Sequence, residues 1–264
     1  MGPIRCVITN DDGNDAPGLR ALYAALRGLA DVAVVAPSTE WSTRGHNAPS
    51  RDPLRVERRD DPEMGRIFVV HAPPADCVRL ALCELIRPAP DAVIAGINRG
   101  SNVGVDVFYS GTVAAAREAA ILGYPAIAIS QLVRKDMPVD WNITARFARR
   151  LLEHLLAELP DARPVPLWNV NLPHLPPGGR PKGIVKVPMA TSPLQICYEA
   201  LDPPHASAGG EPGTYRYTGA YFRRPQPAGT DIEYLFADWA TITELTNDLT
   251  DASVGRAELT WTFD

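Results

Sequence analysis

Short apolar runs alternate with amphipathic helical patterns along the first two thirds of this 264-residue chain. Continuous apolar runs separated by helices are typical of parallel strands that are buried on both faces of a sheet. We therefore expect an α/β protein with a doubly wound, mostly parallel sheet. The predicted strands are residues 5–9, 32–36, 92–95, 126–129 and 167–171, and the predicted helices are residues 19–29, 76–85, 112–122 and 142–159.

The composition changes after about residue 160. Fourteen of the 26 prolines lie between Pro160 and Pro227, and the candidate strands in this part are short, at residues 183–187, 214–217 and 240–245. Because proline cannot donate to a sheet, this pattern favours extended arms and hairpins over a second globular unit. We expect residues 1–160 to form the α/β core with the functional site. Residues 161–264 then add the last core strands and arms that join copies into a homodimer or homotetramer.

The charge balance limits the classes of ligand. The net charge is -5 and no block of Lys or Arg is present, which argues against a groove for nucleic acid. Small anionic ligands remain possible, because a metal or backbone amides can hold them. No apolar stretch approaches the roughly 18 to 20 residues of a spanning helix, and the N-terminal run is too short and acidic for a signal peptide. We therefore expect a cytoplasmic protein, with its four cysteines as free thiols.

Oxygen-bearing side chains follow three of the predicted strands, at residues 10–13, 37–46 and 96–104. Ligands of an open α/β sheet bind outside the carboxyl ends of its strands. The adjacent carboxylates of Asp11 and Asp12 repel each other unless a cation lies beside them, and an all-oxygen ligand set suits Mg²⁺ or Mn²⁺ more than zinc. The alternative is that the pair only caps the next helix or binds a turn amide. The presence of three such loops favours the metal.

Ser110, Gly111 and Thr112 enter a predicted helix. They offer hydroxyls, a glycine that lets an anion approach the backbone, and first-turn amides at the positive end of the helix dipole. These properties predict a phosphate site, although a plain Ser/Thr cap without a ligand is the common alternative for an isolated Ser-Gly-Thr.

Other motifs point to no competing chemistry. The glycines at 96, 100 and 104 match neither GxGxxG nor a Walker A loop, and no GxSxG nucleophile elbow is present. The five histidines form no HExxH spacing; His46 is a hydrogen-bonding loop residue or a catalytic acid. Arg99 is either a phosphate contact or a solvated surface arginine.

Several separate segments, in the right order, resemble the family of the stationary-phase survival protein SurE. The resemblance runs through about residues 5–130, continues at residues 169–173 and is faint at residues 230–231 and 239–243. The matching segments are Thr9-Asn10-Asp11-Asp12-Gly13, Ala16-Pro17-Gly18, Val35-Ala36-Pro37, Ser42 with Gly45-His46, Pro74-Ala75-Asp76-Cys77-Val78, Gly96-Ile97-Asn98-Arg99-Gly100 with Asn102 and Gly104, Tyr109-Ser110-Gly111-Thr112-Val113 with Ala116-Arg117-Glu118, and Asn169-Val170-Asn171-Leu172-Pro173.

The resemblance implies a Rossmann-like core and a metal-dependent phosphatase, a 5′-nucleotidase, that acts on nucleoside 5′- and possibly 3′-monophosphates. It implies one divalent metal ion that is bound by Asp11, Asp12, Ser42 and Asn98. The ion would be Mg²⁺ or Mn²⁺, and Ca²⁺ could replace it in crystals. It places phosphate contacts around Asn98 and residues 110–112, and C-terminal hairpins exchanged between subunits. The loop at residues 43–49 and the segment at residues 183–227 depart from the family pattern, which affects substrate preference and assembly more than the metal site.

The expected reaction is phosphomonoester hydrolysis, with Asp11, Asp12 and Asn98 as the catalytic residues. A metal-activated water would attack phosphorus while the turn at residues 110–112 neutralises the other oxygens. Direct attack by Asp11 or Asp12 is the alternative. Two other functions stay open: a nucleotide-binding sensor that has lost turnover, and a nucleoside-hydrolysing enzyme that uses the Asp pair on calcium.

Overall fold

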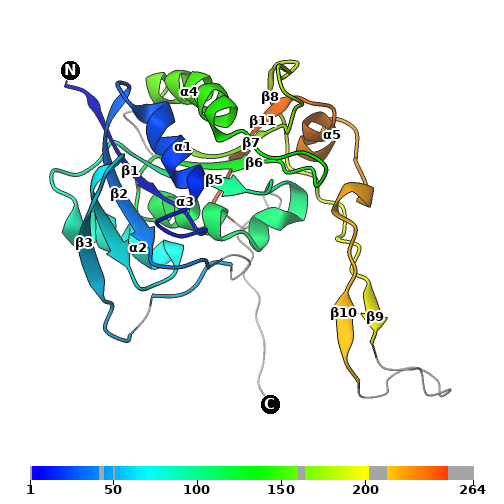
Figure 1. The fold of residues 1–264 in the computed structure, drawn as a ribbon, viewed down its shortest axis with the longest axis horizontal. Coiled ribbons are helices and arrows are strands. Elements are labelled where there is room, and N and C mark those ends of the chain that lie inside the picture. Colours follow the sequence, from blue (N-terminus) through cyan, green and yellow to red (C-terminus); the bar gives the residue numbers. More distant parts are fainter. Residues whose placement is uncertain (1, 42–44, 50, 160–163, 202–212, 249–264) are drawn as a thin grey trace, which may run out of the picture.

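A nine-stranded sheet forms the centre of the molecule (Figure 1). This computed structural model describes residues 2–41, 45–49, 51–159, 164–201 and 213–248. The strands are β1 (Ile4–Thr9), β2 (Ala30–Pro37), β3 (Val56–Asp61), β4 (Gly65–Val70), β5 (Ala92–Arg99), β6 (Ala126–Gln131), β7 (Leu167–Leu172), β8 (Ile184–Lys186) and β11 (Ala240–Leu245). Their order across the sheet is β3-β4-β2-β1-β5-β6-β7-β11-β8.

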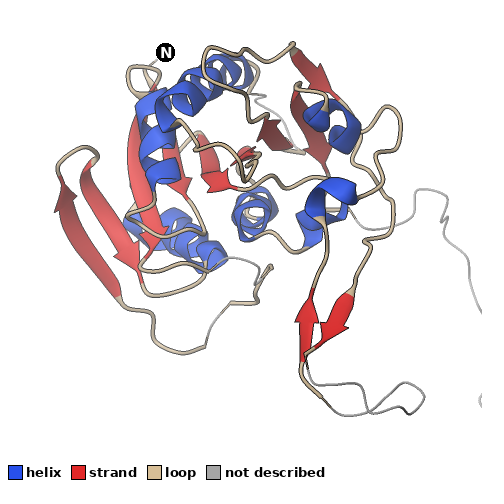
Figure 2. Ribbon diagram, turned by 45° about the vertical axis from the view of Figure 1, so that its right-hand side comes forward, coloured by secondary structure: helices blue, strands red, loops and turns tan. Residues whose placement is uncertain are grey.

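Helices cover both faces of this sheet. They are α1 (Pro17–Leu26), α2 (Pro74–Leu80), α3 (Gly111–Ile121), α4 (Trp141–Ala157) and α5 (Asp231–Phe236), with a π turn η1 (Ala81–Leu85) and 3₁₀ turns η2 (Gly104–Phe108) and η3 (Tyr221–Arg223). Leu22 of α1 and Leu151 of α4 belong to one buried cluster, and Cys77 of α2 and Val113 of α3 belong to the cluster on the other face. Figure 2 shows helices on both sides of the strands. The predicted doubly wound α/β fold is confirmed.

The strand order places a topological switch point between β1 and β5. β1 pairs in parallel with both β2 and β5, and the chain builds the sheet outward from β1 first in one direction and then in the other. The crossovers on the two sides of this point leave in opposite directions, so the loops after β1 and β5 border a crevice. Asp11 and Asp12 lie in the loop after β1, and Asn98 lies at the carboxyl end of β5.

Most predicted elements are present, with shifted ends. The helix predicted from residue 76 starts at Pro74 and passes into the π turn η1. The antiparallel hairpin of β3 and β4 was not predicted, because β3 is a partly exposed edge strand of sequence Val-Glu-Arg-Arg-Asp-Asp that lacks apolar alternation. The short helix α5 was also missed.

The C-terminal region divides into sheet strands and one projecting hairpin. The strands predicted at residues 183–187 and 240–245 are not arms, because β8 and β11 extend the central sheet beyond β7. The strand predicted at residues 214–217 is β10 (Tyr215–Tyr217). It pairs with β9 (Tyr198–Ala200), a short strand that was not predicted, in an antiparallel hairpin that projects from the body (Figures 1 and 2). We call this hairpin the arm.

The cysteines are unpaired, as the sequence predicted. All four cysteines are free thiols; Cys6 and Cys77 are buried, whereas Cys83 and Cys197 are exposed. Within the part of the chain that the structure describes, no helix has the length and apolarity to cross a bilayer.

Candidate active site

A pocket of about 260 Å³ lies at the switch point and brings predicted site residues together. Asp11 follows β1, Asn98 ends β5, and Ser110 and Gly111 start α3; all four line it. The other lining residues are Arg99, Ser101, Asn102, Asp106, Tyr109 and Tyr221. We call this hollow the switch-point pocket.

The remaining predicted residues lie beside the pocket or outside the described residues. One carboxylate oxygen of Asp12 accepts the backbone N–H of Arg99 at 3.2 Å, which holds the loop after β1 against the end of β5. Thr112 is fully buried behind Asp11. Ser42 lies outside the described residues, and Trp41, which precedes it in the sequence, donates its backbone N–H to the carbonyl of Asp11 at 2.7 Å.

Asp11 packs directly on the start of α3. The Thr112 hydroxyl donates to Asp11 Oδ1 at 2.5 Å. A Cβ on Gly111 would lie 2.7 Å from Asp11 Oδ2 and 2.9 Å from Asp11 Cβ, so any larger residue would displace the carboxylate. The positive end of α3 therefore faces a buried carboxylate. Gly111, which was predicted to let an anion approach the backbone, lies against the carboxylate of Asp11.

The two carboxylates are poorly compensated by their surroundings. Burial raises the pKa of Asp11 to about 6, and the nearby charge of Asp12 adds to this rise against the hydrogen bonds from Thr112. Burial also raises the pKa of Asp12, with a smaller contribution from Glu40. Two carboxyls that both resist ionisation side by side mark a place where a cation would be bound favourably.

The end of β5 is shaped to present Asn98. The pairing of β5 with β6 shifts register between Ala95 and Asn98, a bulge that redirects the side chains after it. Asn98 Nδ2 donates to the carbonyl of Gly100 at 2.8 Å, so the amide group is fixed and its nitrogen is engaged. The amide oxygen can then serve a cation, and the second hydrogen on Nδ2 can serve an acceptor.

A buried network holds the loop that follows Asn98. The backbone N–H of Asn102 donates to Asn171 Oδ1 at 2.8 Å, and its side chain donates to Ser130 Oγ at 2.7 Å. Asn169 and Asn171 of β7 both donate to the carbonyl of Asn102. These bonds connect the loop to β6 and β7, so the pocket wall is rigid backbone tied to the sheet.

His46 has a structural contact and does not line the switch-point pocket. Its Nε2 lies 2.6 Å from Glu118 Oε2, and Arg79 forms an ion pair with the same carboxylate at 2.8 Å. Arg79 also bonds Asp76 at 2.8 Å. Of the two sequence interpretations of His46, the hydrogen-bonding loop residue is the one that the geometry matches.

The donor atoms fit a hard divalent cation. Among the described residues, no three His, Cys, Asp or Glu side chains gather into a metal-binding group. Two adjacent carboxylates with an amide oxygen would instead supply the protein part of an oxygen ligand set, as Mg²⁺ and Mn²⁺ accept.

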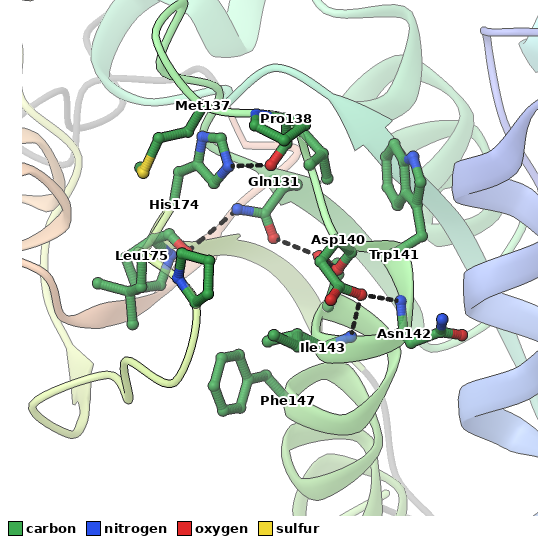
Figure 3. A pocket seen from close by; sticks show the side chains of 14 residues that line it. Gln131, Met137, Pro138, Asp140, Trp141, Asn142, Ile143, Phe147, His174 and Leu175 are labelled. Carbon is green, nitrogen blue, oxygen red and sulfur yellow. Dashed lines mark hydrogen bonds between the residues drawn. The ribbon is translucent and has the colours of Figure 1, made fainter.

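A larger hollow of about 530 Å³ lies elsewhere, at the start of α4 (Figure 3). Its polar groups bond within the protein: Asp140 caps α4, Gln131 donates to the carbonyl of Pro173, and His174 accepts the N–H of Arg134. Among the described residues, its lining includes none of the predicted site. The switch-point pocket is therefore the candidate active site.

Two residues of the pocket escaped sequence reasoning: Asp106 and Tyr221. Tyr221 comes from the region interpreted as assembly arms, and no local pattern links it to a pocket more than a hundred residues earlier. Its docking rests on Arg224, which forms a bidentate ion pair with Asp106 at 2.7 and 3.0 Å. Only a long-range contact of this kind identifies them.

A mostly parallel, doubly wound sheet with an oxygen-rich acidic pocket at its switch point defines a Rossmann-like α/β protein with a site for a small ligand. The family model described as Survival protein SurE matches residues 6–193. The chain belongs to the SurE family, and the resemblance seen in the sequence is confirmed.

The similarity extends over nearly the whole chain. Proteins named 5′-nucleotidase SurE from Syntrophobacter fumaroxidans and Heliobacterium modesticaldum are 38% and 37% identical to it, over 94% and 98% of this chain and 95% and 92% of the relatives. The crystal structure of the SurE protein from Aquifex aeolicus matches with a TM-score of 0.78 and 31% identity, covering 94% of this chain and 95% of that one.

The raised pKa of Asp11 predicts that this carboxylate destabilises the metal-free fold. Between the ordinary pKa of 3.8 and the folded pKa of about 6, the folded state binds more protons than the unfolded state, so this contribution to stability falls as pH rises. In chelator, Asp11→Asn should therefore be more stable than wild type by roughly 1–3 kcal/mol at pH 7.5 and by much less at pH 4.

Urea denaturation of both proteins at the two pH values measures this difference. Asp15→Asn is the matched control, because Asp15 lies in the same loop with its side chain 81% exposed. A stability difference for Asp11→Asn that stays constant across the pH range would contradict the assignment.

Proposed function

We propose that this chain is a divalent-metal-dependent phosphomonoesterase, a 5′-nucleotidase that hydrolyses nucleoside 5′-monophosphates to nucleoside and phosphate. The observation that carries the proposal is the pair of adjacent carboxylates with raised pKa at the switch point: Asp11 is buried against the positive end of α3, and Asp12 lies half-buried beside the end of β5. The relatives named 5′-nucleotidase support the same reaction. Nucleoside 3′-monophosphates are the second substrate class to test.

The proposed metal ligands are Asp11, Asp12, Ser42 and Asn98. A bound Mg²⁺ or Mn²⁺ would supply Lewis-acid chemistry, polarising a phosphoryl oxygen and lowering the pKa of water. Asn98 and residues 110–112 are the predicted phosphate contacts; of these, Asn98 offers an amide N–H, Ser110 its hydroxyl and Gly111 its backbone N–H. All these residues precede residue 113, within the core of residues 1–160.

Thr112 positions the reacting groups from behind. Its hydroxyl is engaged by Asp11 Oδ1, so in this arrangement it orients the carboxylate and leaves phosphate binding to its neighbours. The Asp11 carboxylate is held by this hydrogen bond and packs against the backbone of Gly111. This fixed position disfavours movement of the carboxylate toward phosphorus. Water is therefore our proposed nucleophile, and trapping of a phosphorylated aspartate during turnover would overturn that choice.

A nucleotide sensor without turnover is the alternative on the same fold. It would use the same pocket but release no phosphate. Phosphate release from a panel of nucleoside monophosphates, with and without chelator, separates the two functions, and free base as a product would identify a nucleoside hydrolase.

We also propose that the arm joins copies of the chain into a homodimer or homotetramer in the cytoplasm. The arm exposes aromatic side chains far from the body: Tyr198 is 64% exposed and Tyr217 is 52% exposed, and the two rings meet edge to face. Large exposed aromatic surface on a projecting hairpin is typical of an interface.

Asp11→Asn and Asp12→Asn should each lower kcat for nucleoside monophosphates by roughly 10²-fold or more, because each removes charge from the proposed cation site. Phosphate release under saturating Mg²⁺ or Mn²⁺ measures the loss, and a circular dichroism melt checks the fold. Asp15→Asn should retain wild-type turnover. Near-normal turnover of either site variant would refute the assignment.

Ser110 has two separable roles. Its Oγ accepts the N–H of Val113 at 3.0 Å and caps α3, and the same hydroxyl is the proposed phosphate donor. Ser110→Ala loses both roles, at a capping cost of about 1 kcal/mol, whereas Ser110→Gly loses the hydroxyl but costs only a few tenths as a cap. Both variants should raise the inhibition constant of inorganic phosphate to a similar extent, and only Ser110→Ala should lower the melting temperature clearly. An inhibition constant that is unchanged in both variants would contradict the phosphate role and show that Ser110 serves only as a helix cap.

Tyr198→Lys combined with Tyr217→Lys should shift the oligomer toward single chains, because two charges would be buried in the proposed interface. Light scattering measures the mass of the wild type and of the variant. A wild-type mass equal to one chain would exclude arm-mediated assembly.

A further inference from the structure

A second hollow of about 540 Å³ adjoins the switch-point pocket. Ser101 and Tyr221 line both hollows, so each side of this pair faces a different space. The second hollow lies where the arm meets the body, because η3 directly follows the arm strand β10 (Figure 1). We call it the arm-base groove.

The wall between the two hollows is held rigidly. The Tyr221 hydroxyl lies 2.6 Å from Ser101 Oγ, and the Arg224 guanidinium lies 4.0 Å from the centroid of the Tyr221 ring. Arg224 is in turn fixed by a bidentate ion pair with Asp106, and both side chains of this pair are mostly buried. Burial, with the charge of Asp106, raises the pKa of the Tyr221 phenol above its ordinary value, so this group stays neutral.

The arm-base groove offers the surfaces that a flat aromatic ligand needs. Buried Leu132 and partly buried Val133 form an apolar side, and Phe222 presents a ring that is 40% exposed. The Phe222 ring is supported by Phe236, with ring centroids 5.3 Å apart, so it is a fixed platform. The volume lies within the range of about 300–1,000 Å³ usual for small-molecule sites.

Lys135 and Arg223 form the exposed rim of the groove. Their positive charges favour the approach of an anionic ligand. The proposed phosphate contacts themselves lie on the other side of Tyr221, in the switch-point pocket. A nucleoside monophosphate matches this division, since it has a flat apolar base at one end and a dianionic phosphate at the other.

We propose that the arm-base groove binds the nucleoside half of the substrate, with the Phe222 ring as the stacking surface for the base. The Tyr221–Ser101 pair then sets the spacing between the base and the phosphate in the switch-point pocket. This inference rests on the proposed nucleotidase function and adds a specificity site supplied by the C-terminal region.

The test compares substrates with and without a base. Phe222→Ala should lower kcat/KM for adenosine 5′-monophosphate by about 10- to 100-fold, the effect of losing one base stack. For ribose 5-phosphate, which carries the same phosphate but no base, kcat/KM should change by less than about twofold. Phe222→Tyr retains the ring and should keep nearly wild-type kcat/KM for both substrates.

Two inhibition constants provide an independent readout on the same proteins. Phe222→Ala should weaken inhibition by adenosine and leave inhibition by inorganic phosphate unchanged. Equal losses for both substrates, or no loss for adenosine 5′-monophosphate, would overturn the groove assignment.

Failure of the underlying function gives a different result. In that case wild-type protein releases no phosphate from either substrate, and calorimetric binding of adenosine 5′-monophosphate to wild type and Phe222→Ala still tests the groove. Equal affinity of the two proteins would overturn the inference, and weaker binding by Phe222→Ala would support it without turnover. Ile121→Ala, which removes an apolar side chain that is 56% exposed on α3, is the matched control and should bind like wild type.

Discussion

The contact between Asp11 and the first turn of α3 is the constraint on which the site depends. It joins the end of β1 to a helix that begins a hundred residues later, through the Thr112 hydroxyl and the bare backbone of Gly111. The same contact buries a carboxylate whose ionisation then opposes folding. The two large apolar clusters on the faces of the sheet offset this cost. The protein thus retains local destabilisation where charge is useful, as functional sites commonly do.

Backbone placement at the end of β5 is the second determinant of the site. Gly18 of α1 lies so close to the carbonyl of Ile97 that a Cβ there would collide with it, and a Cβ on Gly96 would collide with the carbonyl of Ile129. These glycines let β5 pass between a helix and the neighbouring strand before the bulge that turns Asn98. The Asn102 network then fixes the loop beyond. Side-chain chemistry at this site is therefore positioned by main-chain contacts that tolerate no added atoms.

The parts of the structure visible from sequence are those set by local pattern. Buried parallel strands such as β6, in which all six residues are buried, are apolar over most of their length, here Ala126–Ile129, and polar residues gather at their carboxyl ends. Hence the sheet and the positions of Asp11, Asn98 and Ser110 followed from the sequence. Strand β3 did not, since an edge strand can be charged. Tyr221 and Asp231 did not either, because their positions depend on partners far away, such as the Gly104 N–H that donates to Asp231 at 2.8 Å. Ser42 lies outside the described residues, so its role remains a prediction.

The C-terminal region supplies both a wall of the switch-point pocket and the projecting arm, two parts that its proline content does not separate. The Arg224–Asp106 pair holds η3 against η2, and Asp231 holds α5 against the start of η2 through the Gly104 N–H, so both contacts lie on the body side of the arm. The β9–β10 strands lie beyond these anchors (Figure 2). Changes in the arm strands would therefore alter the proposed assembly while the pocket wall stays in place. A change at Arg224 acts on both, because it frees η3 from the pocket and the arm from its base at once.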